Sequence, residues 1–309
     1  LGGSGGGNIA VNVPIAGTAG DGDDATDVTM TAGSGTITIE DISTDINDVL
    51  LTSTGGISLD GSITTAVDSD ETGATSGVVT LTGPVTLAGN TTIDTDSTSN
   101  NGAVTFSSTV DGAKTLTITS GSGAVQFGGN IGATTALSDV TVNSSAGTGT
   151  ITFSGNVGAD ATTAGAAVVT VGNSDTASIT FAGVEFTTSG LQLFTADAYS
   201  ITGADSTFGS SNDNITFADG GADGGITLAD IADLTITTEL GGSGGGNIAV
   251  NVPIAGTSGD GDDATDVTMT AGSGTITVED ITTDINDVLL TSTGGISLDG
   301  SITTAVDLS

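Results

Sequence analysis

The sequence lacks most of the side chains that carry chemistry. It contains no cysteine, histidine, tryptophan or arginine, and Lys114 is its only basic residue. Zinc and iron–sulfur sites need Cys or His, and thiol or imidazole catalysis needs the same residues, so these classes are excluded. One lysine cannot supply the basic surface of a nucleic-acid-binding protein, nor clamp phosphate groups. Carboxylate chemistry, hydroxyl chemistry and hard cations remain.

Long apolar runs are also missing. No stretch approaches the ~18 apolar residues that a membrane-spanning helix needs, so no transmembrane segment is expected. Hydrophobic residues nevertheless make up 36% of the chain, which is too many for a disordered protein despite a net charge of −36. The chain starts at Leu1 without an initiator methionine or a signal peptide, and we expect it to be a segment of a longer protein.

A long internal repeat dominates the sequence. Residues 1–68 recur as residues 240–307, and 65 of these 68 positions are identical. The pattern predicts a tandem array, with one full unit at 1–239 and the start of the next, near-identical unit at 240–309. Each unit should therefore meet similar structural demands.

A shorter, degenerate period lies inside the unit, in which a Gly and a small residue precede two apolar residues spaced one apart. Its anchors are Ile9, Ile37, Ile57, Val79, Val104, Val125, Ile151, Ile179, Ile201, Ile226 and Ile248. Their ten intervals predict about ten coils of about 24 residues per unit, which is typical of solenoid proteins.

Strict alternation identifies the secondary structure. The run from Leu116 to Thr119 places two aliphatic side chains on one face and two threonines on the other, as in a β-strand. A helical spacing over residues 42–50 is discounted, because strand-like patterns flank it. A stack of sandwich domains would repeat near ~100 residues and usually bury a tryptophan. The sequence therefore favours an all-β fold, a parallel β-solenoid.

Four phenylalanines fall at one position of the short motif in successive coils: Phe106, Phe127, Phe153 and Phe181. The spacing predicts a stack of buried rings in the core. Phe186, Phe194 and Phe208 lie outside the motif, in the least regular stretch.

Residues 123–132, 137–142 and 149–158 carry a resemblance to known proteins. Their Gly-Ala-Val-Gln-Phe-Gly-Gly-Asn and Gly-Thr-Ile-Thr-Phe-Ser-Gly-Asn motifs resemble the repeats of giant bacterial surface proteins of the filamentous-haemagglutinin and autotransporter-passenger type. The resemblance implies a secreted right-handed β-helix at the cell surface or outside the cell, used as an adhesin shaft, matrix or fibre. Host surfaces or glycans fit such a role as partners, and the resemblance carries no catalytic residues. Separately, the unpaired strands at the open ends of a solenoid array predict end-to-end or lateral assembly with further copies of the chain.

The acidic residues are concentrated enough to hold cations. If 309 residues make about 13 coils, the rod is about 62 Å long and carries one net charge per about 1.7 Å, comparable to duplex DNA. The richest loop recurs in both units, so its carboxylates predict a calcium site in each. These residues are Asp21, Asp23, Asp24 and Asp27, with Asp260, Asp262, Asp263 and Asp266 in the second unit. A solvated loop without metal is the alternative.

A second acidic pattern places an aspartate directly before a strand, at Asp27, Asp48, Asp139 and Asp233. We expect each carboxylate to accept backbone N–H groups at a corner of the coil. A cation shared between stacked carboxylates is the alternative.

The sequence predicts a non-catalytic structural segment that forms a fibre or shaft. A carbohydrate- or ice-binding module is the alternative, because four Thr-x-Thr pairs could form a flat hydroxyl array: Thr29/Thr31, Thr36/Thr38, Thr117/Thr119 and Thr235/Thr237. Catalysis is not expected, since stacked aspartates reach glycosidase distances in any solenoid and only Lys114 could hold an acidic substrate.

Overall fold

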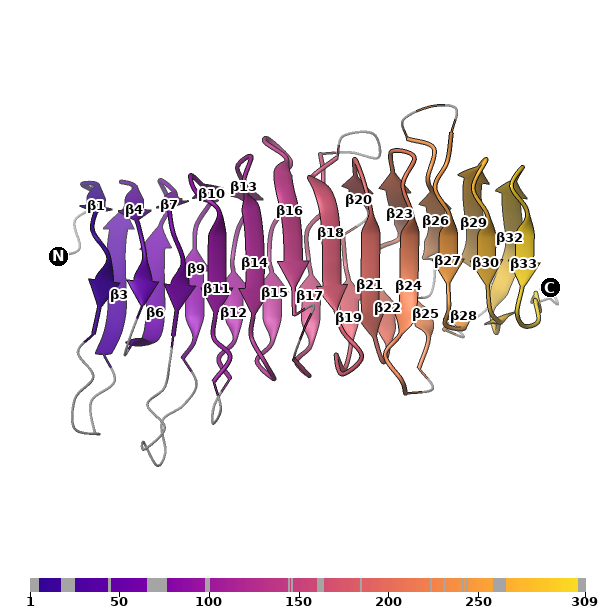
Figure 1. Cartoon of the computed structure of the whole chain (residues 1–309), viewed down its shortest axis with the longest axis horizontal. Helices are drawn as coiled ribbons and strands as arrows, with labels where there is room; N and C mark the ends of the chain where they lie inside the picture. Colours follow the sequence, from indigo (N-terminus) through magenta and orange to yellow (C-terminus); the bar gives the residue numbers. More distant parts are fainter. Residues whose placement is uncertain are drawn as a thin grey trace.

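The structure is a rod of stacked β-coils. The computed structural model describes residues 6–17, 26–43, 46–65, 77–97, 101–143, 145, 147–159, 164–183, 185–222, 224–229, 232–240, 242, 244–257 and 265–304. Every helix or strand within them is a β-strand, and every pairing between the named strands is parallel. The first coil lies at one end of the rod and the last at the other (Figure 1). The predicted all-β parallel β-solenoid is confirmed.

Each coil contributes a strand or a single bridging residue to three parallel sheets, here named face 1, face 2 and face 3 in chain order. Face 1 contains β1 (Ile9–Val11), β4 (Ile37–Ile39), β7 (Ile57–Leu59), β10 (Val85–Leu87), β13 (Val110–Asp111), bridges at Ile131 and Val157, β20 (Glu185–Thr188), β23 (Asp205–Ser210), β26 (Asp233–Thr237), β29 (Thr265–Gly272) and β32 (Ile285–Ser292). Face 2 contains β2 (Ile15–Ala16), β5 (Ile42–Ser43), β8 (Ile63–Thr64), β11 (Thr91–Asp94), β14 (Thr115–Thr119), β16 (Leu137–Val142), β18 (Ala166–Gly172), β21 (Gln192–Ala196), β24 (Ile215–Asp219), β27 (Ile248–Val250), β30 (Ile276–Val278) and β33 (Ile296–Leu298). Face 3 contains β3 (Thr26–Gly33), β6 (Ile46–Ser53), β9 (Val79–Thr82), β12 (Val104–Phe106), β15 (Val125–Phe127), β17 (Ile151–Phe153), β19 (Ile179–Phe181), β22 (Tyr199–Ile201), β25 (Ile226–Leu228), β28 (Ile254–Gly256), β31 (Ile281–Thr282) and a bridge at Ile302.

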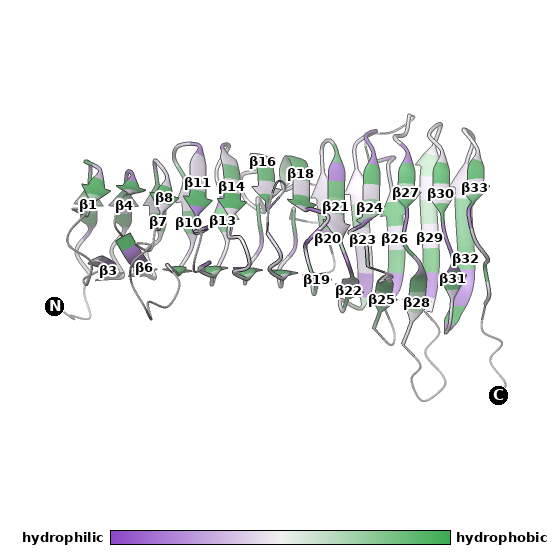
Figure 2. Cartoon of the chain, turned by 60° about the horizontal axis from the view of Figure 1, so that its bottom comes forward, coloured by the Kyte–Doolittle hydropathy of each residue, from purple (hydrophilic) through white to green (hydrophobic). Residues whose placement is uncertain are grey.

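The core runs along the axis of the rod between the three faces. In β12, Val104 and Phe106 are buried, while Thr105 between them points outward. Apolar and polar segments alternate along the strands in the same way (Figure 2). Val104 is paired with Val79 in the preceding coil and Val125 in the following one. Because one coil cannot bury its own apolar face, stability depends on the neighbouring coils.

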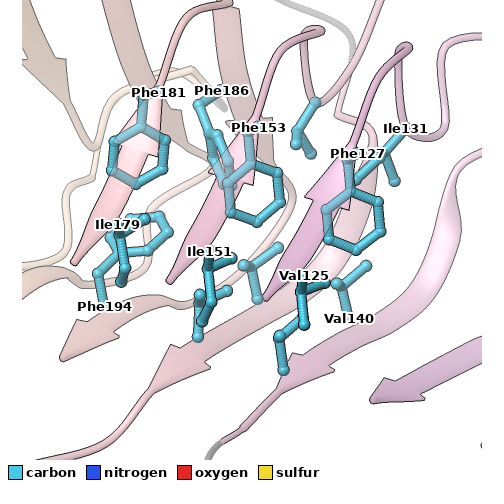
Figure 3. Packing of buried hydrophobic residues seen from close by; sticks show 14 of the residues in the cluster. Val125, Phe127, Ile131, Val140, Ile151, Phe153, Ile179, Phe181, Phe186 and Phe194 are labelled. Atoms are coloured by element: carbon cyan, nitrogen blue, oxygen red, sulfur yellow. The ribbon is translucent and has the colours of Figure 1, made fainter. Parts of the chain in front are cut away.

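The predicted phenylalanine stack is confirmed on face 3. The ring centroids lie 5.2 Å apart between Phe106 and Phe127, 5.0 Å between Phe127 and Phe153, and 5.7 Å between Phe153 and Phe181. The rings are nearly parallel, with interplanar angles of 7–9°. Figure 3 shows three of these rings on successive strands. Such pairs contribute about 0.5–1.5 kcal/mol each beyond the burial of their area.

Three phenylalanines outside the motif also belong to this core. Phe186, Phe194 and Phe208 lie on faces 1 and 2, and each meets Phe181 edge to face at 5.0–5.5 Å. Figure 3 shows Phe186 and Phe194 beside the stack. The irregular stretch of sequence thus fills the rod with rings from all three faces.

The pairing differs from the predicted anchors at three places. Ile57 pairs with Val85 rather than Val79, and Ile226 pairs with Ile254 rather than Ile248. A further shift of two residues places Tyr199, not Ile201, beside Ile179. Val-Thr-Leu occurs in β9 on face 3 and in β10 on face 1, and Ile-Ser-Leu occurs in β7 on face 1 and in β33 on face 2, so the sequence motif does not identify the face.

Candidate functional site

Two of the eight predicted calcium ligands lie in the described part of the chain. Asp27 is the second residue of β3 on face 3, and Asp266 is the second residue of β29 on face 1. Asp21, Asp23, Asp24, Asp260, Asp262 and Asp263 lie outside the described residues. Among the described residues, no three or more Asp, Glu, His or Cys side chains gather in a metal-binding group. Calcium binding by the two loops stays a prediction.

Asp27 and Asp266 make the same contacts in the two units. Asp27 Oδ1 accepts the backbone N–H of Asp48 at 3.2 Å and the side-chain amide of Asn47 at 3.3 Å. Asp266 Oδ1 accepts the equivalent groups of Asp287, at 3.0 Å, and Asn286, at 3.4 Å. Each carboxylate therefore joins its own coil to the next one.

This contact belongs to a general device along the rod. Fourteen described Asp and Asn side chains accept a backbone N–H from the following coil at 2.6–3.3 Å, and we call them inter-coil acceptors. They are Asn8, Asp27, Asp41, Asp48, Asn90, Asp111, Asn130, Asn156, Asp197, Asn214, Asp233, Asn247, Asp266 and Asp280. Asp27, Asp48 and Asp233 accept a backbone N–H as predicted, but Asp27 and Asp48 do so from within β3 and β6 and not from a position before a strand. Asp139 lies within β16 and is not among the acceptors in the described coils.

Asp280 shows the electrostatic effect of such a contact. Its Oδ1 accepts the backbone N–H of Ser301 at 2.6 Å and the Ser301 hydroxyl at 2.8 Å. These two hydrogen bonds favour the ionised carboxylate and hold the pKa of Asp280 below its ordinary value. Ionised Asp280 therefore accepts these two hydrogen bonds more favourably than the protonated form does.

The largest buried polar side chains brace the core. Gln192 Nε2 donates to the carbonyl oxygens of Phe186 and Gly209, which fastens face 2 to face 1. The Tyr199 hydroxyl accepts the amide of Ala196, and its oxygen lies 2.5 Å from the Ala218 carbonyl. Burial raises the pKa of Tyr199, so this phenol stays protonated. Tyr199 and the Gln192 amide nitrogen thus join elements of the core, while Gln192 Oε1 is buried with no hydrogen-bond partner.

The threonine pairs do not form one surface. Thr29/Thr31 lies on face 3, Thr117/Thr119 on face 2 and Thr235/Thr237 on face 1. Thr36/Thr38 is also on the face 1 side, at β4. Most strands of face 3 are three residues long and point one side chain outward, so the outward column there is one residue wide, and Gln126 interrupts its threonines. The arrangement does not favour a flat hydroxyl array.

Exposed apolar surface is concentrated at the two ends of the rod. The exposed fractions of equivalent residues in the two copies of the repeat show this directly. Ile57 and Leu59 are each 1% exposed, whereas their copies Ile296 and Leu298 in the last coil are 46% and 50% exposed. At the other end, Val13 is 63% exposed and its copy Val252 is 1% exposed. Identical sequence is thus buried where a coil covers it and open where none does. Comparison of the two copies, rather than any motif, locates these surfaces.

The described residues contain no helix long and apolar enough to cross a membrane.

Comparisons with known proteins found no relative of the chain. No protein-family model matches the chain, and the searches of curated proteins and of solved structures each found no match.

Proposed function

We propose that the chain is a segment of a non-catalytic structural rod, the shaft or fibre of a larger repetitive protein. The observation that carries this proposal is the continuous strand pairing across the junction between the two units. β27, the first strand of the second unit, pairs in register with β24 before it and β30 after it, through Ile215, Ile248 and Ile276. A boundary between separate domains would interrupt the sheet here. Tandem units therefore lengthen one continuous rod.

The last described coil shows the surface that a following coil would cover. The last coil exposes Ile296 and Leu298, and its strands leave one side of their backbone unpaired. Unpaired strand edges are templates for further pairing. Further coils, from the same chain or from a second copy, are the partners that fit this surface.

Location at the cell surface or outside the cell is part of the proposal, and it rests on the resemblance of residues 123–158 to bacterial surface repeats.

Calcium binding is the second part of the proposal. The face 1 pairing gives twelve rungs from Ile9 to Leu290, or about 53 Å of rod at ~4.8 Å per coil, for a net charge of −36. Such a charge density attracts cations, and the two acidic loops supply the oxygen ligands that calcium prefers.

Electron microscopy of the purified chain, with millimolar calcium and with a chelator, tests the proposal. Rods that join end to end, with a layer spacing of about 4.8 Å along the axis, are expected. Loss of the fibres on chelation would assign calcium to the loops or to the contacts between rods. Short rods that never join, under either condition and at high concentration, would contradict axial assembly, and globular particles would contradict the rod itself.

A further inference from the structure

The two copies of the repeat do not occupy the same faces of the rod. β1 lies on face 1, but its copy β27 lies on face 2. β3 and β6 lie on face 3, and their copies β29 and β32 lie on face 1. Each element is displaced by one face.

Counting rungs gives the cause of the displacement. Nine steps along face 1 lead from Ile9 to Ile236, and Ile248 follows on the next face, one third of a coil further. The rungs between them are Ile37, Ile57, Val85, Val110, Ile131, Val157, Phe186 and Phe208. A unit of 239 residues therefore contains 9⅓ coils and not a whole number.

The displaced copy rebuilds the same local structure. The pairing of β3 with β6 has register shifts at Thr26/Val28 and Thr31/Gly33, and the copies on face 1 have the equivalent two shifts. The Ser53 hydroxyl donates to the Gly35 carbonyl at 2.5 Å, and Ser292 repeats this bond to Gly274 at 2.5 Å. The same sequence therefore forms these contacts on face 3 in the first unit and on face 1 in the second.

We infer that successive units are turned about the axis by one face, so that each surface of the unit is presented on three sides of the rod in turn. The third unit after any given one restores the starting face, after 717 residues and 28 coils. The axial step between units is about 45 Å and the full period about 134 Å.

Presentation of each surface on three sides of the rod rests on the proposed function and specifies how the fibre would meet its partners. The outward leucine of β6 illustrates it: Leu50 is 39% exposed on face 3, and its copy Leu289 is 58% exposed on face 1. A partner that binds one unit at a time, such as a neighbouring rod, can therefore approach the fibre from three directions. A fibre of this kind presents each surface of the unit on three sides, whereas a rod with whole-coil units would present it on one side only.

Disulfide mapping in the 309-residue chain tests the displacement, because the chain has no cysteine of its own. Thr216 and Ala249 are paired neighbours on face 2, so Thr216→Cys/Ala249→Cys should close a disulfide. Ten whole coils per unit would instead place Ala249 beside Thr227. The double variant Thr227→Cys/Ala249→Cys should therefore keep its thiols free.

A second junction repeats the test with Ser58. The structure pairs it with Thr86, whereas whole coils would pair it with Thr80. Thr105→Cys/Gln126→Cys is the positive control, since both arrangements pair these residues. Mild oxidation at low protein concentration, followed by mass spectrometry of unreduced peptides, identifies each intramolecular bond.

The outcomes distinguish failure of the proposed displacement between units from failure of the solenoid itself. Bonds 216–249 and 58–86, without 227–249 and 58–80, are expected. The reverse pattern would give whole-coil units and overturn the three-sided display while leaving the rod intact. Bonds in both members of a pair, or in neither, would show that the strands hold no fixed register there and would equally overturn it. Failure of the 105–126 control would instead contradict the solenoid on which the proposed function depends.

Discussion

Ile57 and Ile296 offer a direct measurement of what one covering coil contributes to stability. Both are the first residue of an Ile-Ser-Leu strand in identical local sequence, and both pair with an isoleucine in the preceding coil. Only Ile57 is covered on its other side, by Val85. Their exposures, 1% and 46%, therefore differ because of one neighbouring coil.

Truncation of the two residues should have unequal effects. Ile57→Ala should lower the free energy of unfolding by about 2–5 kcal/mol, since it leaves a cavity in a closed core. Ile296→Ala should cost about 1 kcal/mol, because roughly half of its side chain is already in water. Urea unfolding at low protein concentration, followed by far-ultraviolet circular dichroism, measures both.

Equal costs for the two variants at low concentration would refute the reasoning. They would mean either that Ile57 is not enclosed or that the last coil is covered by something other than the described residues. Concentration is the internal control. If rods join end to end, the cost of Ile296→Ala should rise with protein concentration, while that of Ile57→Ala should not change.

Three further predictions follow from single contacts. Phe153→Ala, in the middle of the ring stack, should cost about 3–5 kcal/mol in the same unfolding assay, and a cost under about 1 kcal/mol would contradict a closed stack. Gly246→Ala should destabilise the rod by about 1–3 kcal/mol, because the new Cβ would lie 2.1 Å from a backbone atom of the preceding coil, whereas its copy Gly7→Ala meets nothing within 4 Å and should be neutral. Equal effects of the two glycine variants would contradict the stacking of the second unit. Asp280→Asn keeps an oxygen acceptor but removes the charge. The pKa of Asp280 is lowered in the folded state, so the ionised carboxylate stabilises the rod at pH values above the ordinary aspartate pKa. This stabilisation is lost as the pH falls through the lowered pKa. The difference in urea midpoint between the parent and Asp280→Asn should therefore vanish in acid, and a pH-independent difference would contradict the assignment.

The sequence predicted the features that depend on one coil and its nearest neighbours. Alternation of aliphatic residues and threonines predicted strands, and the region around Ile46 that has helical spacing is indeed strand in β5 and β6. The spacing of Phe106, Phe127, Phe153 and Phe181 predicted their stack, because all four share one motif position. Aspartates before strands predicted capping, because a carboxylate there lies close to free amides of the next coil.

The features that depend on counting faces could not be predicted. Ile57, Val79 and Val85 stand in nearly the same local sequence, yet the first and third lie on face 1 and the second on face 3. Only pairing across the coil decides between them. Phe194 was missed for a related reason, since it fills the core from face 2 and shares no motif with the stack on face 3.

The inter-coil acceptors give the side-chain contacts of the rod a polarity. Among the described residues, Asn8, Asp48 and the other twelve all accept an amide from the coil that follows them, and Asn143, which accepts from Ser120, runs the other way. Apart from Asn143, a coil therefore offers these side-chain oxygens to the segment that comes next in the chain. In a polypeptide that emerges from the ribosome amino terminus first, these oxygens are present before the amides that they accept. We therefore expect each coil to form on the one before it.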